Sequence, residues 1–437
     1  MAEHILSYEQ ALDEVLKHAR AVASPPAHER IDLLDALGHV LAEPVIAPRA
    51  HPPFDRSTRD GYAIRTEDFD ALNAGQALRL IGSVRAGESW RGAELASGQA
   101  IEIMTGAPLP AGADAVIMLE HVVAENESLR LRQPRALRAG ENFVARGSEA
   151  RSGDVLLPAG CRIGPAEIAV AASCGAAQLT VFEQPKVAII PTGDELVELS
   201  LSPQAALTDA QIYNSNSHAL AALVRSEGAS AGRLKIVPDD RQELFERIAQ
   251  GSMWDMMLLS GGVSMGKHDL VEGVLAEFGA EFFFTGAKIQ PGRPIVFGRV
   301  PKNGVVLSAK AEDRTSPAET PWQGEWTYFF GLPGNPISTQ VCFHLFVAPM
   351  LRALAGETEI APRFAEARLA DHVRANPELT RFLPAELTSA FDAATIHLIG
   401  WQGSGDLAAN ARANCYCVLP PRDEDFTTGE TVRVLLR

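Results

Sequence analysis

Three short polar loops of this chain have residue types suited to chemistry. They are Pro191–Leu196 (PTGDEL), Ser260–Ser264 (SGGVS) and Gly331–Pro336 (GLPGNP). Each follows an apolar run with the composition of a buried strand: Val187–Ile190, Met256–Leu259 and Tyr328–Phe330. Because helical sequence follows each loop, the pattern predicts that all three lie at the carboxyl edge of one α/β sheet. Open sheets bind their ligands at that edge.

These loops combine groups for an anion with groups for a cation. Glycine, serine and threonine offer N–H and hydroxyl groups to a phosphate, whereas Asp194 and Glu195 suit a hard cation such as Mg²⁺. Asp239, after a strand predicted at Leu234–Val237, and Asp269 are expected at the same edge. Converging carboxylates repel one another unless a cation compensates, which favours a metal site. The alternative is that each acid caps its own helix.

Further candidates lie outside these loops. Arg293, on the proline-restrained loop Lys288–Pro294, has a planar fork suited to an oxyanion. Ser338 is expected in the first turn of a helix at Ile337–Ala355, where free N–H groups can meet an anion. Asp60 lies in a stiff, proline-containing segment that suits an anion or metal site as well as a structural turn. Thr105 lies in a second such segment, which can present its hydroxyl to a phosphate but by itself favours a structural turn.

Bulk properties limit the function classes. The chain has 437 residues and a net charge of −16, which argues against a nucleic-acid partner. We find no long uncharged apolar run and no secretory leader, and the five cysteines lack a CxxC pair, so we expect a cytoplasmic protein with reduced thiols. Dinucleotide, P-loop, nucleophile-elbow and zincin motifs are missing from the sequence.

Changes in pattern along the chain predict four domains. A helix should begin at Ser7 with a capping box to Gln10, and a second helix is predicted at Glu29–Leu37. Alternating strands and helices predict a mostly parallel α/β domain, and short strands predict an inserted β-rich domain and a small C-terminal β barrel or sandwich. The expected boundaries are 1–48 plus 146–180 for a mixed N-terminal domain, 49–145 for the inserted domain, 181–357 for the α/β domain and 358–437 for the C-terminal domain.

Six ordered motifs resemble one family. They are F-D-x-S-x-x-D-G-Y-A, I-M-T-G-A-P-x-P-x-G-A-D-A-V, T-G-D-E-L, S-G-G-V-S-x-G, Q-P-G-R-P and G-L-P-G-N-P. The set is similar to that of the molybdopterin molybdenumtransferases, the MoeA family, which is related to the E domain of gephyrin. The match runs from about residue 7 to residue 355. Arg293 stands where that family more often has lysine, and 308–326 looks like an insertion.

The resemblance implies an enzyme of molybdenum cofactor biosynthesis. It would insert molybdenum from molybdate into adenylylated molybdopterin and release AMP, with Mg²⁺ assisting. The α/β domain would be the molybdopterin-binding domain. The family forms a homodimer whose active site combines this domain of one subunit with the inserted domain of the other. A MogA-like adenylyltransferase is a possible donor of the substrate.

The resemblance and the residue chemistry together give a set of site residues. We expect catalytic roles for Asp60 and Asp269 and metal ligands in Glu195, Asp239 and Asp269. The expected substrate-binding residues are Thr105, Gly193, Asp194, Ser260, Gly261, Gly262, Ser264, Pro291, Gly292, Arg293, Pro333, Gly334, Asn335, Pro336 and Ser338. Within this set, Arg293, Ser338 and the turn Pro333–Asn335 are the candidates for molybdate.

Two alternative functions remain at this point. One is adenylyl transfer onto molybdopterin, the reaction of the MogA-like single-domain proteins, which needs neither of the two β domains. The other is a non-catalytic scaffold of the gephyrin type. Release of AMP from an adenylylated pterin would distinguish an enzyme from a scaffold.

Overall fold

The computed structural model describes residues 4–22, 27–200, 206–262, 270–302, 325–389 and 393–437. Ser264, Asp269 and residues 308–324 therefore lie outside the described residues. The chain forms two units, one of Met1–Ala42, Gly160–Gly164 and Gln178–Arg437, the other of Glu43–Ala159 and Pro165–Ala177. The exact boundaries of the four expected domains stay predictions.

A six-stranded sheet is the centre of the first unit. Its order is β17-β14-β18-β23-β22-β19. Neighbours among the first four strands pair in parallel, whereas β22 runs antiparallel to both of its neighbours. The mostly parallel α/β domain is thus confirmed. The strands are β14 (Lys186–Pro191), β17 (Ser230–Arg233), β18 (Met256–Ser260), β19 (Glu281–Phe284), β22 (Val296–Pro301) and β23 (Trp326–Leu332).

Successive side chains of the central strands enter two different cores. In β14, Val187 and Ile189 belong to one buried cluster, and Ala188 and Ile190 belong to the other. This alternation follows from the two-residue period of a strand and explains why the run is apolar throughout. Both faces of the sheet must therefore be covered by helices.

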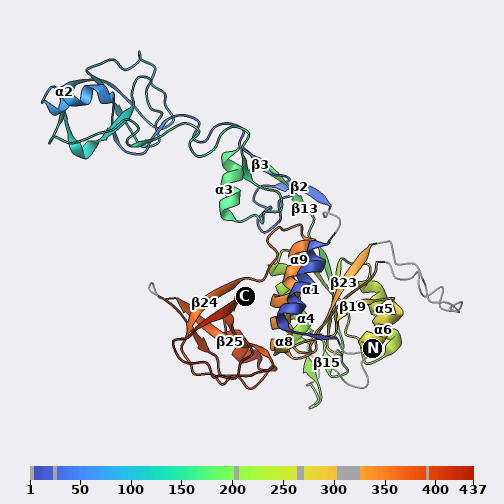
Figure 1. The fold of residues 1–437 in the computed structure, drawn as a ribbon. Coiled ribbons are helices and arrows are strands. Elements are labelled where there is room, and N and C mark those ends of the chain that lie inside the picture. The colour runs from blue at the N-terminus through green and yellow to red at the C-terminus, as the bar shows by residue number, and fades with distance from the viewer. Residues whose placement is uncertain (1–3, 23–26, 201–205, 263–269, 303–324, 390–392) are drawn as a thin grey trace. The chain divides into compact units, whose positions relative to one another are not determined.

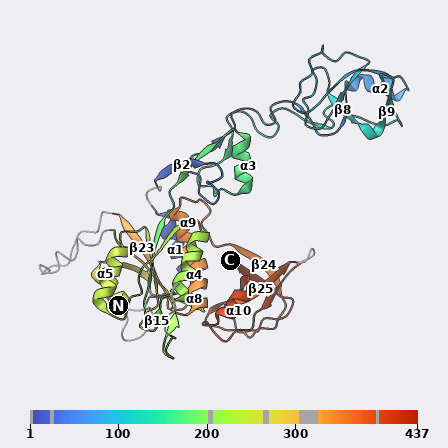
Figure 2. The same ribbon diagram turned by 180° about the vertical axis from the view of Figure 1, so that it is seen from behind.

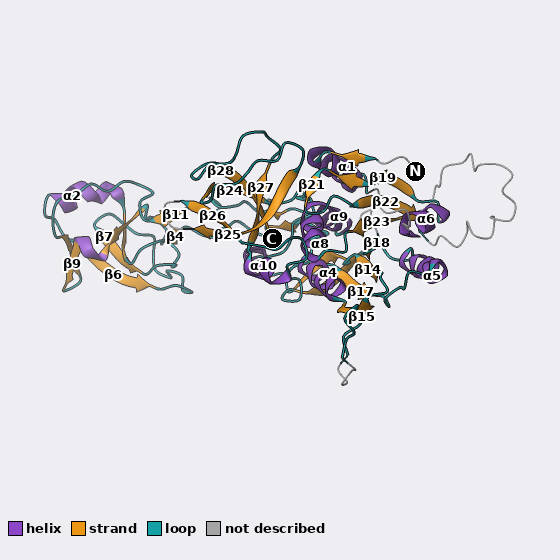
Figure 3. Cartoon of the chain, turned by 90° about the horizontal axis from the view of Figure 1, so that it is seen from below, coloured by secondary structure: helices purple, strands orange, loops and turns teal. Residues whose placement is uncertain are grey.

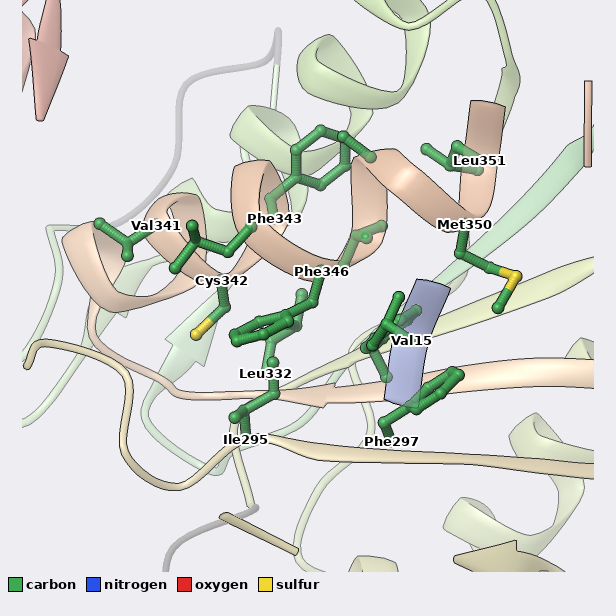
Figure 4. Packing of buried hydrophobic residues seen from close by; sticks show 14 of the residues in the cluster. Val15, Ile295, Phe297, Leu332, Val341, Cys342, Phe343, Phe346, Met350 and Leu351 are labelled. Carbon is green, nitrogen blue, oxygen red and sulfur yellow. The ribbon is translucent and has the colours of Figure 1, made fainter. Parts of the chain in front are cut away.

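Helices cover both faces as this pattern requires. Helices α1 and α9 lie on one side of the sheet, and α5 and α6 lie on the other (Figures 1 and 2). Figure 4 shows the first core, where Val15 from α1 meets Phe297 from β22 and aromatic side chains of the closing helix. The helices are α1 (Tyr8–Arg20), α4 (Ser215–Ser226), α5 (Arg241–Gly251), α6 (Leu270–Glu277), α8 (Pro336–Cys342) and α9 (Ala348–Leu354).

The first helix begins where its capping box predicted. The Gln10 N–H donates to the Ser7 hydroxyl at 3.2 Å, and the Ser7 N–H donates to the Gln10 side chain at 3.0 Å. Both bonds satisfy N–H groups that a helix start otherwise leaves without partners.

The second predicted helix, Glu29–Leu37, is wrong. Its first residues form β2 (His28–Asp32), which pairs antiparallel with β13 (Gln178–Phe182), and a turn follows. Leu34 and Leu37 are 80% and 57% exposed, so no apolar face is buried there. A strand partner almost 150 residues away outweighed the local helical pattern. The strand predicted at Leu234–Val237 instead occupies the four residues before it, as β17.

The closing helix runs from Pro336 to Leu354 and contains one π-helical turn, η4 (Phe343–Val347), between α8 and α9. It is long and apolar enough to cross a membrane by composition, but 89% of its most apolar window is buried inside the protein. It is therefore the core helix of the α/β domain, and the described residues include no other helix that passes this test.

His344 lies in the π-helical turn with its Nε2 buried and without a hydrogen-bond partner. Burial lowers the pKa of His344 from 6.5 to about 4, and Arg437 and Arg352 add to this effect while Glu227 opposes it. On acidification, the unfolded chain therefore binds this proton at a higher pH than the folded protein does. The free energy of unfolding should fall as the pH drops through 6.5, and the loss should reach roughly 3 kcal/mol below pH 4.

We expect His344→Phe, which cannot titrate, to lose correspondingly less stability than the parent protein on acidification. Urea unfolding at about pH 7.5 and about pH 4.5 measures this difference. Equal losses in both proteins would show that His344 carries no such linkage.

Five strands of the C-terminal region close into a barrel in the order β25-β26-β24-β28-β27, with β27 pairing back to β25. Strand β21 of the α/β domain adds to β25, and α10 of the barrel lies beside α8 (Figure 3). The predicted C-terminal barrel is confirmed. Its elements are β21 (Ile289–Gln290), β24 (Phe364–Leu369), β25 (Thr380–Ser389), β26 (Ala394–Leu398), α10 (Leu407–Arg412), β27 (Cys415–Leu419) and β28 (Thr431–Leu436).

The second unit contains the expected β-rich domain, a six-stranded sheet in the order β8-β5-β7-β6-β10-β9. Its strands are β5 (Gly61–Ile64), β6 (Leu78–Val84), β7 (Gln99–Ile103), β8 (Ala115–Met118), β9 (Val122–Glu125) and β10 (Ser128–Leu131). The other elements of this unit are β3 (Val45–Ile46), β4 (Arg56–Ser57), α2 (Phe69–Asn73), β11 (Phe143–Val144), β12 (Val155–Leu157) and α3 (Pro165–Ser173).

Candidate active site

The loops that follow β14 and β18 meet at the carboxyl edge of the sheet. Gly261 has a φ of +95°, and a Cβ there would lie 2.4 Å from the Thr192 carbonyl oxygen. A side chain is thus excluded by both conformation and space. The Thr192 hydroxyl, at the same place, is buried and forms no hydrogen bond with the described residues. The junction of these two loops therefore contains a hydroxyl donor that has no partner among the described residues, next to exposed backbone.

The third loop lies next to this junction. The Gly261 N–H donates to the Leu332 carbonyl at 3.3 Å, and a Cβ on Gly334 would lie 3.8 Å from the Gly261 Cα. Asn216 of α4 donates its side-chain amide to the Gly334 carbonyl at 2.6 Å. For the described residues, which include the second loop only as far as Gly262, the prediction that the three loops lie together is confirmed.

Thr339 of α8 stabilises the turn Pro333–Pro336 by hydrogen bonds. Its hydroxyl donates to the Pro333 carbonyl at 2.6 Å, and its N–H donates to the Asn335 carbonyl at 3.0 Å. Pro336 occupies the start of the helix, where its missing N–H has no cost. The turn is therefore fixed before any ligand arrives.

We expect Thr339→Val, which keeps the shape but removes the hydroxyl, to lower the free energy of unfolding by about 1 kcal/mol because the Pro333 carbonyl loses its donor. Thr339→Ser, which keeps the donor, should lose less. Urea unfolding of the two variants checks the prediction. A greater loss in the serine variant would assign the effect to the methyl group.

A pocket of about 430 Å³ is lined in part by this turn. Six predicted substrate-binding residues line it, namely Pro291, Gly292, Arg293, Pro333, Asn335 and Ser338. Arg293 is exposed, and its guanidinium forms no ion pair within the described part of the chain. Gly292 has a φ of +112°, and a Cβ there would lie 2.6 Å from the buried Cys342 sulfur. The pocket thus offers a free cation on a tightly packed loop.

Three further lining residues, Ile289, Gln290 and Pro294, belong to the candidate loop Lys288–Pro294. The rest of the wall was not predicted from the sequence and consists of Leu379, Trp401, Gly403 and Ser404 of the C-terminal barrel region. The Ser404 carbonyl accepts the Ile337 N–H at 3.0 Å, which joins the barrel to the helix start. The glycines at 400, 403 and 405, after β26, are the one sequence feature that could have suggested a binding turn there.

Two of the acids expected at this edge, Asp194 and Asp239, lie next to each other. The Asp194 Oδ1 accepts the Asp239 N–H at 3.0 Å, and Asp194, Glu195 and Asp239 are all exposed. None of these three carboxylates pairs with a basic side chain in the residues that the structure describes. Oxygen donors without cationic partners match the preference of Mg²⁺, so the donor chemistry fits. The described residues contain no ready-made group of three ligands, and Asp269 is not among them.

Asp60 and Thr105 lie together in the second unit. The Asp60 Oδ1 accepts the Thr105 N–H at 2.7 Å and the Thr105 hydroxyl at 2.9 Å. These two bonds, the N–H first, lower the pKa of Asp60 below its usual value. The exposed side chain is therefore an oriented carboxylate, and its Oδ2 accepts no hydrogen bond from the described residues.

Comparisons with known proteins agree with this architecture. Family models match in order along the chain: MoeA N-terminal region (domain I and II) at residues 6–175, a probable molybdopterin binding domain at 188–353, and MoeA C-terminal region (domain IV) at 366–436. These three models together span most of the chain.

Curated relatives and a solved structure cover nearly the whole chain. A molybdopterin molybdenumtransferase of Staphylococcus aureus (strain Mu50 / ATCC 700699) is 33% identical over 93% of this chain and 90% of its own length. One from Nostoc sp. (strain PCC 7120) is 34% identical over 93% and 88%. The crystal structure of the molybdopterin biosynthesis MoeA protein from Pyrococcus horikoshii OT3 is 28% identical, covers 99% of this chain and 100% of its own, and has a TM-score of 0.73. The chain therefore belongs to the MoeA family of molybdopterin molybdenumtransferases, which are transferases of molybdenum cofactor biosynthesis.

Proposed function

We propose that this chain inserts molybdenum from molybdate into adenylylated molybdopterin and releases AMP, a late step of molybdenum cofactor biosynthesis. Adenylylated molybdopterin carries a phosphoanhydride at one end and a dithiolene at the other. A site for this reaction must hold phosphate groups and a tetrahedral oxyanion at neighbouring positions.

The turn Pro333–Pro336 carries the proposal because it borders two such positions. Gly334 lies next to Gly261, and Gly261 lies against Thr192, whose buried hydroxyl has no partner among the described residues. Glycine backbone and hydroxyl groups of this kind suit phosphates. Pro333 and Asn335 line the pocket that contains Arg293 and Ser338. One substrate molecule lying across this turn would place its phosphoanhydride on one side and its dithiolene on the other.

The pocket residues bind and orient molybdate in this proposal. The Arg293 fork donates two hydrogen bonds to two oxygens of the dianion, and the Ser338 hydroxyl donates a third. As the two dithiol sulfurs bind molybdenum, their two protons leave with one molybdate oxygen as a water molecule, and the fixed donors hold the oxygens that remain. Preorganised donors of this kind need no rearrangement during the reaction.

In this proposal, the carboxylates at the sheet edge and Asp60 of the inserted domain promote cleavage of the phosphoanhydride. Glu195, Asp239 and Asp269 would hold Mg²⁺, which supplies charge neutralisation for the phosphate oxygens. Asp60 orients the water that attacks the phosphoanhydride and accepts its proton, while Thr105 fixes the carboxylate. Cleavage of the phosphoanhydride releases AMP and leaves the pterin with its own phosphate.

We also propose that the active protein is a homodimer in the cytoplasm. The inserted domain of one subunit would then bring Asp60 and Thr105 to the sheet edge of the other. A MogA-like adenylyltransferase would supply the substrate, and the strongly acidic chain would take small anions rather than a nucleic acid as partners.

Anaerobic incubation of the purified protein with adenylylated molybdopterin, Mg²⁺ and molybdate tests the proposal. We expect AMP and metal-loaded cofactor to form together and to depend on molybdate. Formation of adenylylated pterin from ATP would favour the adenylyltransferase alternative. A protein that produces neither product would be a scaffold.

A further inference from the structure

The pocket beside the turn is much larger than molybdate requires. A water molecule takes about 30 Å³ of liquid, so an anion with four oxygens displaces roughly 120 Å³. The pocket measures about 430 Å³, so more than half of it remains when the oxyanion is bound. The remaining space is therefore large enough for a second group of the same substrate.

Part of the pocket lining is apolar. Ile289, Leu379 and Trp401 contribute to it, in contrast to the polar Arg293 and Ser338. Trp401 is half-buried and packs against both the core of the α/β domain and the core of the barrel. This packing restrains the indole at the pocket lining, and an aromatic side chain there suits contact with a planar ring.

Buried hydrogen bonds keep this wall at a fixed distance from the helix. Asn410 of α10 donates its side-chain amide to the Gln340 Oε1 of α8 at 2.9 Å, and the Tyr416 hydroxyl donates to the Asn410 Oδ1 at 2.9 Å. All three side chains are at least 92% buried. Together with the Ile337–Ser404 bond, they fix the turn that carries Trp401.

Polar groups at the rim match the edge of a heterocycle. Gln290 is exposed at the pocket, and its side-chain amide offers both a donor and an acceptor. A pterin presents an amide-like edge with both kinds of group. An adenine ring would also stack, so the position of the ring within the substrate must decide between them.

We propose that Trp401, with Ile289 and Leu379, forms a subsite for the pterin ring of the substrate, beside the oxyanion position at Arg293. This inference rests on the proposed function. The dithiolene is attached to the pterin, so metal insertion requires that ring next to molybdate. The adenine lies beyond two phosphates, on the far side of the turn Pro333–Pro336.

Isothermal titration calorimetry with three separate probes tests the subsite: 6-hydroxymethylpterin, AMP and molybdate. We expect Trp401→Leu to weaken pterin binding at least tenfold and Trp401→Phe, which keeps an aromatic ring, to weaken it less than threefold. Molybdate and AMP affinities should change less than twofold in both variants. Trp90→Leu, in the inserted domain, is the matched control and should bind all three probes as the parent does.

Several outcomes would overturn the subsite. They are no saturable pterin binding by the parent protein, unchanged pterin binding by Trp401→Leu, or a selective loss of AMP binding, which would assign the wall to adenine. Retained molybdate binding shows that a variant has folded. Failure of the proposed function is distinct, since pterin binding would still depend on Trp401 while no AMP or metal-loaded cofactor formed.

Discussion

Arg293→Ala is expected to lower kcat/KM for molybdate by roughly a thousandfold. The guanidinium loses two charge-assisted hydrogen bonds worth about 2 kcal/mol each, and about 1.4 kcal/mol corresponds to a factor of ten. Arg293 forms no ion pair within the described residues, so its removal leaves no partner charge behind. Metal-loaded cofactor formed at limiting molybdate measures the effect, and excess molybdate should restore part of the rate.

Two further variants separate charge from shape. Arg293→Lys keeps the charge but loses the planar fork, so we expect an intermediate loss of about tenfold. Lys288→Ala removes an exposed cation from the same loop but not from the pocket lining, and it should change the rate less than twofold. If Lys288→Ala lowered the rate as much as Arg293→Ala does, the effect would come from the electrostatic potential of the loop and not from hydrogen bonds donated by Arg293.

The sequence predicted the loop arrangement because local signals determine it. Buried parallel strands must be apolar throughout, as Val187–Ile190 is, and the residues after them must turn. Since parallel strands end at one edge, three such turns meet without any long-range information. The Ser7–Gln10 capping box is equally local, and its two hydrogen bonds are present as predicted.

The pocket wall from the barrel had no comparable signal. Trp401 lies more than 60 residues beyond Ser338, and its position depends on the buried contacts of Gln340, Asn410 and Tyr416. Each of these residues alone is an ordinary core or cap residue. The wrong helix at Glu29–Leu37 has the same origin, because the partner strand β13 could not be inferred from the residues of that segment. In both cases tertiary pairing decided the structure.

Asp60→Asn is expected to lower the rate of AMP release from adenylylated molybdopterin by about 10²- to 10⁴-fold, the usual contribution of a general base. The asparagine oxygen can still accept the Thr105 N–H and hydroxyl, so the loop should keep its shape while the charge is lost. The lowered pKa of Asp60 keeps the parent side chain ionised down to acidic pH. Activity carried by this group should therefore fall only when the pH drops below the ordinary carboxyl range. Quantification of AMP in single-turnover experiments measures both effects.

Neighbouring residues supply the controls that distinguish chemistry from folding. The Asp55 Oδ1 accepts the Arg146 N–H at 2.7 Å in the same domain, so Asp55→Asn is a matched substitution and should change AMP release less than twofold. Thr105→Val keeps the N–H bond to Asp60 but loses the hydroxyl bond, and we expect about a tenfold loss because the carboxylate is less firmly oriented. Full activity in Asp60→Asn would remove Asp60 from the chemistry. Equal losses in Asp55→Asn and Asp60→Asn would instead assign the effect to the fold of the inserted domain.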